Sequence, residues 1–450
     1  MVGQVAVAPA AKLRGELRMP GDKSMTHRAL LMAGMAAGRS TISDASDGLD
    51  PRSTAACLEA LGVAIDRAGG ADGHATYRID SPGIGAWTDP AGDLDCGNSG
   101  TTLRMLAGAL VGSPVRATLD GDASLRVRPV ARIVNPLRAM GADIWARADD
   151  GRPPVTVVGG APLHGIDHAP SVPSAQVKSA IMLAGLAAEG MTVVRERVAT
   201  RDHTERMLRA RGVTVDVEAD SATGAVVVRL EGGQAIRPLD ERIPGDVSSA
   251  MFWLVAGASH PDARLTLKGV GVNPTRRAAI DVLRAMGASI DESPVDKSKG
   301  ESPDVEPVAD LTVASSPLTA IDLSAADVAA AIDEIPALCL AAACAAGVTR
   351  IRGAGELRHK ESDRLTGVAE GLNALGARVT IEGDDLVIVG GGRRPHFGLR
   401  GGEVDARDDH RLAMTFAVAG LLADGQVRFD GRSAAVSYPT FFGDLERIRA

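Results

Sequence analysis

The stretch PGDKSMTHRALLMAGMAAG, residues 20–38, places a polar cluster directly before a run of small and aliphatic residues. A capping residue such as Asp22, followed by an apolar run, is typical of a helix start. Such a start carries unpaired backbone N–H groups and the positive end of the helix dipole, so it attracts anions. The stretch therefore predicts a helix that begins near Asp22 with polar chemistry at its N-terminus.

The same pattern recurs five times along the chain. The copies are CGNSGTTLRMLAGALVG (96–112), SVPSAQVKSAIMLAGLAAEG (171–190), PGDVSSAMFWLVAGAS (244–259), DEIPALCLAAACAAG (333–347) and DDHRLAMTFAVAGLLADG (408–425). Between the copies, a second helical pattern stops at a glycine, the residue that most easily adopts the left-handed conformation after a helix. These glycines are Gly62, Gly141, Gly212, Gly287 and Gly376.

Short alternating or apolar segments such as VTVDVEA and AVVVRLEG follow these glycines and read as paired strands. We therefore predict an α/β chain of six βαβαββ units in two similar domains. One domain spans residues 20–244, and the other combines residues 1–19 with 245–450, so the chain crosses near Pro20 and Pro244. VAVAP (5–9) and LRGELRMP (13–20) are expected to complete the sixth unit, and DESPVDKSKGESPDVEP (291–307) reads as a surface insertion.

Composition excludes several function classes. Aromatic residues make up only 2% of the 450 residues, which argues against base stacking on nucleic acid, and 52 glycines favour close helix contacts in the core. The net charge of −8 argues against binding to anionic membranes. The four cysteines have neither disulfide nor zinc spacing, and no targeting or membrane segment is evident, so we expect a cytoplasmic protein.

Several cations stand where helices are predicted to begin, although a positive charge opposes the dipole there. A bound polyanion explains their placement. They are Lys23, Arg28, Arg128, Arg201, Lys360, Arg364 and Arg411. Capping alone accounts for Asp22, Ser174 or Ser248 taken singly. The carboxylates Asp333, Glu334, Glu361, Asp363, Asp408 and Asp409 fit either ion-pairing caps or acid/base chemistry.

Nucleotide and metal sites are not indicated. The chain shows no Walker A sequence and no G-x-G-x-x-G motif after a strand. His27, His203, His359 and His410 lack the spacing of metal ligands, so we expect no metal.

Eight motifs appear in the order of a known family along essentially the whole chain. They are PGDKSMTHRA, GNSGTTLR, GDASLRVRP, SAQVKSA, TRDHTE, IDEIP, HKESDRL and DDHRLAM. Together they resemble the 5-enolpyruvylshikimate-3-phosphate synthases, more closely the second bacterial class than the enterobacterial one. The resemblance implies the enolpyruvyl transferase fold, with an active site in the cleft between the two domains.

The resemblance also implies a reaction: addition of shikimate 3-phosphate through its 5-hydroxyl to phosphoenolpyruvate, followed by elimination of phosphate, without metal or cofactor. It implies that Asp333, Glu361 and Lys23 are catalytic. The implied shikimate 3-phosphate contacts are Lys23, Ser24, Arg28, Ser174, Ala175, Gln176, Arg201, Asp333 and Lys360. The implied phosphoenolpyruvate contacts are Lys23, Gly100, Arg128, Gln176, Arg364 and Arg411.

Two positions depart from the family pattern, and one arginine fits two different roles. Ser437 stands where many members carry a lysine, and Glu356 where enterobacterial members carry an asparagine. Arg201 fits a contact to the substrate phosphate or an ion pair with Asp202 or Glu205. Gly100 predicts inhibition by glyphosate, because tolerant members can carry alanine there.

Two other functions fit parts of this sequence. A UDP-N-acetylglucosamine enolpyruvyl transferase shares the fold, but it carries a reactive cysteine where this chain has Ala123. A non-catalytic anion-binding repeat protein is expected to lack Lys23, Asp333 or Glu361, which are all present. The expected partners are therefore small molecules, with no nucleic acid and no membrane, and we expect a monomer.

Overall fold

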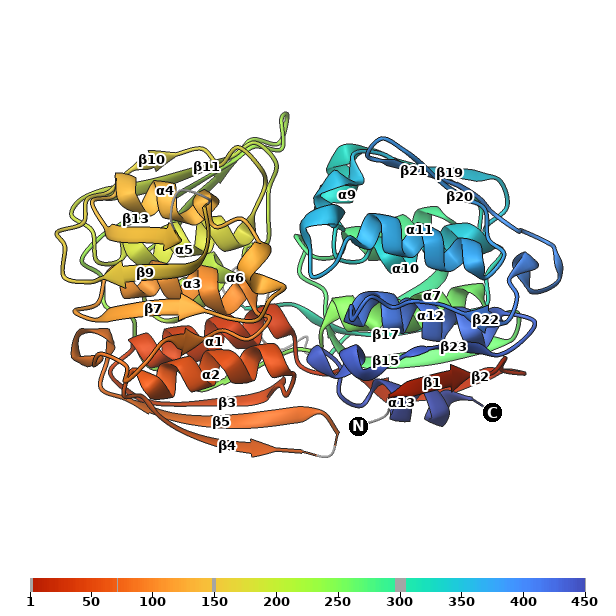
Figure 1. Cartoon of the computed structure of the whole chain (residues 1–450), viewed down its shortest axis with the longest axis horizontal. Helices are drawn as coiled ribbons and strands as arrows, with labels where there is room; N and C mark the ends of the chain where they lie inside the picture. The colour runs from red at the N-terminus through yellow and green to blue at the C-terminus, as the bar shows by residue number, and fades with distance from the viewer. Residues whose placement is uncertain (1–2, 71, 148–150, 296–304, 450) are drawn as a thin grey trace. The chain divides into compact units, whose positions relative to one another are not determined.

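The computed structural model describes residues 3–70, 72–147, 151–295 and 305–449. These residues form two compact units (Figure 1). The first unit contains residues 21–243 together with 305 and 306, and the second contains residues 3–20, 244–295 and 307–449. Most of the insertion predicted at 291–307 lies outside the described residues, but residues 305 and 306 belong to the first unit.

The first unit consists of three repeats, each with two longer helices and a four-stranded sheet. In each sheet a two-residue strand runs parallel to its neighbour, and the other pairs are antiparallel. The first repeat contains α1 (Lys23–Met35), β3 (Gly38–Ser46), α2 (Leu49–Ala60), β4 (Ala64–Gly69), β5 (His74–Ser81) and β14 (Glu241–Arg242). The second contains β6 (Leu94–Asp95), α3 (Gly100–Leu110), β7 (Arg116–Asp120), α4 (Ala131–Ala139), β8 (Asp143–Arg147) and β9 (Arg152–Val158). The third contains β10 (Asp167–His168), α5 (Ala175–Gly185), β11 (Met191–Glu196), α6 (His203–Ala210), β12 (Asp216–Ala219) and β13 (Val226–Glu231).

The second unit repeats the same order, with a three-stranded last sheet. Its first repeat contains β2 (Leu13–Arg18), α7 (Val247–Ser259), β15 (Ala263–Gly271), α8 (Ala278–Ala285), β16 (Ser289–Pro294) and β17 (Val308–Ala314). The next contains β18 (Asp322–Leu323), α10 (Ile335–Cys344), β19 (Val348–Ile351), α11 (Arg364–Ala374), β20 (Val379–Glu382) and β21 (Asp385–Val389), with the short α9 (Ala325–Ala330) after β18. The last contains β22 (Gly402–Glu403), α12 (His410–Leu422), β23 (Val427–Asp430), α13 (Phe441–Ile448) and β1 (Gln4–Val7). The predicted α/β fold of six repeats is confirmed.

Two strands pair outside their chain order. β2 directly precedes α1 in the sequence but lies parallel to β15, and β14 precedes α7 but lies parallel to β3. β1 pairs with β23, as expected for VAVAP. The expectation that LRGELRMP also completes the last repeat is wrong, because β2 belongs to the sheet of β15. β2 does contact α13, and Leu13 forms an isolated bridge with Arg449. Alternation predicts a strand but does not specify its partner.

The two helices of a repeat differ in burial, as their sequences require. Every residue of α7, α10 and α12 is buried, consistent with apolar and small residues on all sides, and these helices contact one another. The second helices end as predicted, since Gly62, Gly141, Gly212, Gly287 and Gly376 all have positive φ. The buried helices thus begin at the six polar clusters, and the glycines turn the chain back toward each sheet.

Small residues allow the helices to pack closely. α3 and α5 meet at Gly108, where an added Cβ would lie 2.3 Å from the Ala180 carbonyl oxygen. The second unit instead groups the scarce aromatic rings, with Trp253 stacked on Phe441 at a centroid distance of 4.8 Å. Among the described helices, none is long and apolar enough to cross a membrane.

Candidate active site

The candidate residues fall into two groups, one in each unit. The group in the first unit comprises Lys23, Ser24, Arg28, Gly100, Arg128, Ser174, Ala175, Gln176 and Arg201. The group in the second unit comprises Asp333, Lys360, Glu361, Arg364 and Arg411. Within each unit the structure gathers its group around the starts of buried helices and the segments beside them.

Polar side chains cap five of these helix starts. The Asp22 carboxylate accepts a hydrogen bond from the Met25 amide at 2.8 Å, and Ser174 accepts one from Val177 at 3.4 Å. The prediction that Ser248 caps a helix is wrong, because Asp246 caps α7 and accepts a hydrogen bond from the Ser248 amide. Ser248 lies inside the helix, and its hydroxyl donates to Glu334. The other two caps are Ser99 at α3 and Asp409 at α12.

Lys23 is held by a carboxylate that the sequence analysis missed. Its Nζ lies 2.8 Å from Asp50 Oδ2, and the two side chains are 14% and 9% exposed. Asp50 comes from the first turn of α2, where a negative charge is favourable. The ammonium group at the start of α1 is therefore fixed in place and largely removed from water.

Ser24, Arg28 and Arg201 are brought together, although they are distant in the sequence. Arg28 donates from Nη1 to the Ser24 carbonyl at 2.9 Å, and Arg201 donates to the Ser24 hydroxyl at 3.3 Å. Arg28 is buried in the second turn of α1, not the first, and it also donates to Thr204 and Ser179. Of the two carboxylates weighed as partners of Arg201, Glu205 pairs with Lys178 and Asp202 with Arg206.

Two guanidinium groups converge at Gly100. A Cβ added there would lie 2.7 Å from Arg104 Nη1 and 3.4 Å from Arg128 Nη1. Arg104 also donates to Gln176 Oε1 at 2.6 Å, so Gln176 and Gly100 share one arginine. Sequence reasoning missed Arg104, although it stands one turn after Gly100 in the quoted motif GNSGTTLR. Two like charges at one helix start form a ready binding site for an anion.

Arg128 has an N–H group that is not used in hydrogen bonds among the described residues. Its Nη2 donates to Asn98 Oδ1 at 2.7 Å and to Ser124 at 3.3 Å. Its Nε is buried and has no hydrogen-bond partner among the described residues. A buried N–H group left unpaired is costly, so a ligand that accepts from it is favoured.

Arg364 is the centre of the group in the second unit. Its side chain is 1% exposed and lies 2.8 Å from Asp409, 2.6 Å from Glu361 and 3.8 Å from Asp333. Burial alone lowers the pKa of Arg364, but the charges of Asp409, Glu361 and Asp333 raise it above its ordinary value. This guanidinium therefore stays charged and holds the carboxylates in place.

Lys360 and Arg411 complete the same group. Lys360 Nζ lies 3.2 Å from the Asp333 carboxylate, and Arg411 Nη1 donates to the Asp333 carbonyl at 2.8 Å. The structure thus brings all the candidate residues of this unit around Asp333. Glu334 connects this cluster to Arg276, because it lies 3.9 Å from both Arg411 and Arg276. Arg276 also donates to Ser248 at 2.8 Å, and no sequence motif marked it.

His27 now has a structural explanation. It is fully buried, and its Nδ1 lies 2.7 Å from the Thr54 hydroxyl, which in turn contacts Thr102 at 2.7 Å. Burial, followed by the charges of Lys23 and Arg28, lowers the pKa of His27 well below its usual value. A neutral His27 therefore links α1, α2 and α3.

Ser437 and Glu356 mark the two departures from the family pattern. Ser437 is 5% exposed and ends the short helix η5 (Arg432–Val436). Glu356 lies partly buried in η3 (Ala354–His359), the short helix that precedes Lys360. Both positions therefore belong to the second unit, and Glu356 lies in the segment that leads to the Asp333 cluster.

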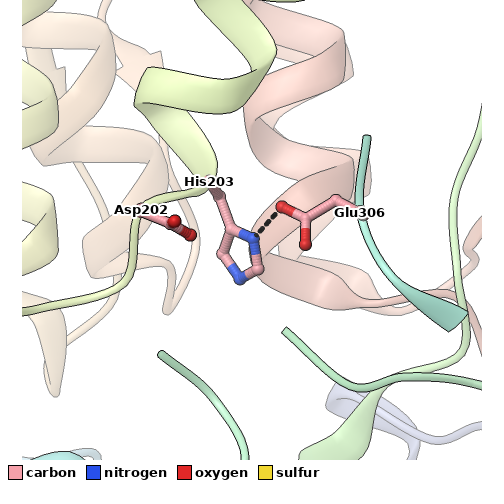
Figure 2. A group of neighbouring side chains, drawn as sticks. All are labelled: Asp202, His203 and Glu306. Atoms are coloured by element: carbon pink, nitrogen blue, oxygen red, sulfur yellow. Dashed lines mark hydrogen bonds and ion pairs between the residues drawn. The ribbon is translucent and has the colours of Figure 1, made fainter. Parts of the chain in front are cut away.

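Asp202, His203 and Glu306 form a cluster of metal-type ligands, with atoms within 4.8 Å of one another (Figure 2). His203 Nδ1 lies 2.6 Å from Glu306, and Arg206 lies 2.8 Å from Asp202. The short separation is that of a hydrogen-bonded pair, and the arginine charge opposes a second cation at Asp202. We therefore interpret the cluster as the contact that joins residues 305 and 306 to α6.

Comparisons with known proteins show similar sequences along nearly the whole chain. Residues 7–445 match the family model of EPSP synthase (3-phosphoshikimate 1-carboxyvinyltransferase). The chain is 50% identical over 446 residues to the 3-phosphoshikimate 1-carboxyvinyltransferase of Gloeobacter violaceus. The aligned region covers 99% of this chain and 98% of that protein. Its counterpart in Chloroflexus aurantiacus is 45% identical over 450 residues, with 100% and 99% covered.

Solved structures show the same likeness. The EPSP synthase of Acinetobacter baumannii superposes with a TM-score of 0.84 at 39% identity, covering 100% of this chain and 98% of that one. The enolpyruvyl transferase NikO of Streptomyces tendae shares the fold, with a TM-score of 0.75 at 20% identity and coverage of 99% and 97%. Because the family model spans nearly the whole chain and the relatives match it from end to end, this protein belongs to the EPSP synthase family.

Proposed function

We propose that this protein transfers the enolpyruvyl group of phosphoenolpyruvate to the 5-hydroxyl of shikimate 3-phosphate and releases phosphate. The observation that carries the proposal is the convergence of Arg104 and Arg128 at Gly100, with an unpaired Arg128 Nε beside them. Membership of the EPSP synthase family supports the same substrates. An anion with a phosphate and a carboxylate suits paired guanidinium groups.

The first half of the reaction is an addition. The 5-hydroxyl oxygen bonds to C2 of phosphoenolpyruvate, its proton goes to Asp333, and C3 gains a proton from Glu361 or Lys23. Lys360 at 3.2 Å holds the Asp333 carboxylate, and Arg364 at 2.6 Å holds Glu361. Charged side chains already in position reduce the reorganisation required in the transition state.

The second half is an elimination. The methyl group of the tetrahedral intermediate loses a proton, and the bond between C2 and the phosphate oxygen breaks. The phosphate leaves with the bonding electrons, so stabilisation of its negative charge lowers the barrier. Gly100, Arg128, Gln176, Arg364, Arg411 and Lys23 are the proposed contacts of the phosphoenolpyruvate portion.

The remaining candidate residues hold the other substrate. We propose that Lys23, Ser24, Arg28, Ser174, Ala175, Gln176, Arg201, Asp333 and Lys360 contact shikimate 3-phosphate. The shared contact of Arg28 and Arg201 with Ser24 supports the grouping within the first unit. We further propose that the boundaries between the two domains lie near residues 20 and 244. We also propose that the enzyme acts as a monomer in the cytoplasm and that glyphosate competes with phosphoenolpyruvate.

Turnover in deuterium oxide tests this route. An addition that forms a methyl group, followed by loss of any of its hydrogens, places deuterium in the methylene group of the product. We expect phosphate release from the two substrates together with deuterium in the enolpyruvyl product, read by mass spectrometry. Phosphate release with no deuterium incorporated contradicts the addition and elimination steps, and no phosphate release contradicts the function.

A further inference from the structure

A group of buried charges lies behind the candidate phosphate contacts of the first unit. Lys178 of α5 has its Nζ 2.8 Å from Glu196 at the end of β11 and 2.7 Å from Glu205 of α6. The three side chains are only 1%, 3% and 1% exposed. One lysine thus joins three elements of the third repeat, and the proposed reaction gives it no role.

The charges of this group depend on one another. Burial alone lowers the pKa of Lys178, but Glu205 and then Glu196 raise it above its ordinary value. Glu205 stands in the first turn of α6, where the helix dipole favours its negative charge. A buried carboxylate that loses its partner is strongly destabilising, so the three side chains hold one another in a fixed geometry.

Glu196 carries this geometry to the segment of Arg201. It accepts hydrogen bonds from the Thr200 hydroxyl and, at 3.3 Å, from the Thr200 amide. Arg201 is the next residue, and it donates to Ser24 at 3.3 Å. The loop 197–202 is therefore tied at Thr200, directly before the arginine.

Packing holds this loop only in part. A cavity of about 170 Å³ is lined by Pro170, Ser171, Pro173, Glu196, Arg197 and Val198. Because that part of the loop borders a cavity, fewer side chains pack against it, and the hydrogen bonds at Thr200 help to fix its path.

A second connection runs alongside the first. Ser179 follows Lys178 in α5 and contacts the Thr204 hydroxyl at 2.6 Å, and Arg28 donates to both side chains. Two adjacent residues of α5 therefore support the two arginines. Ser179, together with Thr204 of α6, contacts Arg28, and Lys178 supports Arg201 through Glu196 and Thr200.

We propose that Lys178 is a positioning residue: acting through Glu196 and Thr200, it holds Arg201 where that arginine binds the phosphate group of shikimate 3-phosphate. This inference rests on the proposed function. It assigns a role to a buried charged group that does not itself touch substrate. The expected signature is a selective loss of affinity for one substrate.

The test compares two isosteric substitutions. Thr200→Val removes the hydroxyl that links the loop to Glu196. Thr192→Val is the matched control, since Thr192 lies in β11 and its buried hydroxyl has no hydrogen-bond partner among the described residues. We expect Thr200→Val to raise KM for shikimate 3-phosphate about fivefold to tenfold, as for the loss of one hydrogen bond. KM for phosphoenolpyruvate and kcat should stay near wild type, and Thr192→Val should change none of the three constants.

Lys178→Met supplies a second measurement. We expect a larger rise in KM for shikimate 3-phosphate than in Thr200→Val, together with a lower melting temperature. A folded Lys178→Met protein with wild-type KM overturns the proposal. If this variant does not fold, the comparison between Thr200 and Thr192 decides alone.

The failures of the two proposals are distinguishable. A wild-type protein that releases no phosphate from phosphoenolpyruvate with shikimate 3-phosphate contradicts the proposed function. A wild-type protein that turns over, while Thr200→Val matches Thr192→Val or changes all three constants equally, overturns the positioning role alone.

Discussion

At the residue scale, each candidate cation has a specific acceptor that fixes its position. Lys23 is paired with Asp50, Arg128 with Asn98 and Arg364 with Asp409. Groups held in this way are already oriented when a charged substrate arrives, which reduces the cost of reorganisation. The partners are therefore as informative as the cations themselves.

Lys23→Met tests the central cation of the first unit. The Met side chain retains the aliphatic bulk but removes the charge proposed to serve both binding and proton transfer. We expect a folded protein whose kcat/KM is lower by about a thousandfold or more, a loss of roughly 4 kcal/mol of transition-state stabilisation.

A matched control uses another lysine. Lys268→Met removes the partner of Asp310, and both residues of that pair are partly exposed, so activity should stay near wild type. Steady-state assays with circular dichroism check both variants. A folded Lys23→Met enzyme with near-normal turnover removes Lys23 from the mechanism.

Gly100→Ala tests the convergence of guanidinium groups. The new Cβ lies 2.7 Å from Arg104 Nη1, so this flexible side chain has to move away from the start of α3. We expect KM for phosphoenolpyruvate to rise about tenfold, equivalent to about 1.4 kcal/mol, and inhibition by glyphosate to weaken.

Gly85→Ala serves as its control, because a Cβ at Gly85 meets no atom within 4 Å. Competition assays with glyphosate against phosphoenolpyruvate compare the two variants. Equal inhibition of Gly100→Ala and wild type argues against an anion site at this glycine.

At the scale of elements, the repeat explains why the candidate residues gather. Each buried helix begins at a polar cluster, and five of the six second helices end at a glycine with positive φ, so the same local geometry recurs. Periodicity and capping signals in the sequence predict these starts and ends. They do not predict Asp50 or Arg104 as partners, because those contacts depend on how neighbouring helices pack.

Gly108→Ala tests helix packing in the first unit. Its Cβ would lie 2.3 Å from the Ala180 carbonyl oxygen and 2.6 Å from the Ala180 Cα, so the backbones of α3 and α5 have to separate. Overpacking of this kind costs about 1–3 kcal/mol, more than alanine gains over glycine in helix propensity. We therefore expect a lower free energy of unfolding in urea.

Gly443→Ala in α13 is predicted to act in the opposite direction. It is exposed, and its added Cβ meets no atom within 4 Å, so helix propensity alone should stabilise the protein by about 0.5–1 kcal/mol. The same sign of change in both variants contradicts the packing argument.

At the scale of the whole molecule, the chain passes between the two units more often than the sequence indicates. It crosses after residues 20 and 243, again between residues 295 and 305, and a fourth time after residue 306. The crossing after 306 and the pairing of β2 with β15 were not predictable, because strand patterns do not name their partners. The repeat boundaries were predictable, because composition changes sharply at each helix start.

The candidate residues were predictable to a similar extent. Lys23, Arg128, Arg364 and Arg411 stand out in the sequence as cations at helix starts, a placement that capping does not explain. Their roles are implied by the family resemblance and not by their placement. Long-range contacts such as Arg276 with Ser248, and the buried group around Lys178, carry no local signal and are visible only in the folded chain.

The choice of acceptor tests the proposed function more directly than any single variant does. Phosphate release from phosphoenolpyruvate is measured with the purified protein and either shikimate 3-phosphate or UDP-N-acetylglucosamine as the second substrate. We expect release with shikimate 3-phosphate alone. Release only with UDP-N-acetylglucosamine, or with neither acceptor, would contradict the proposed function.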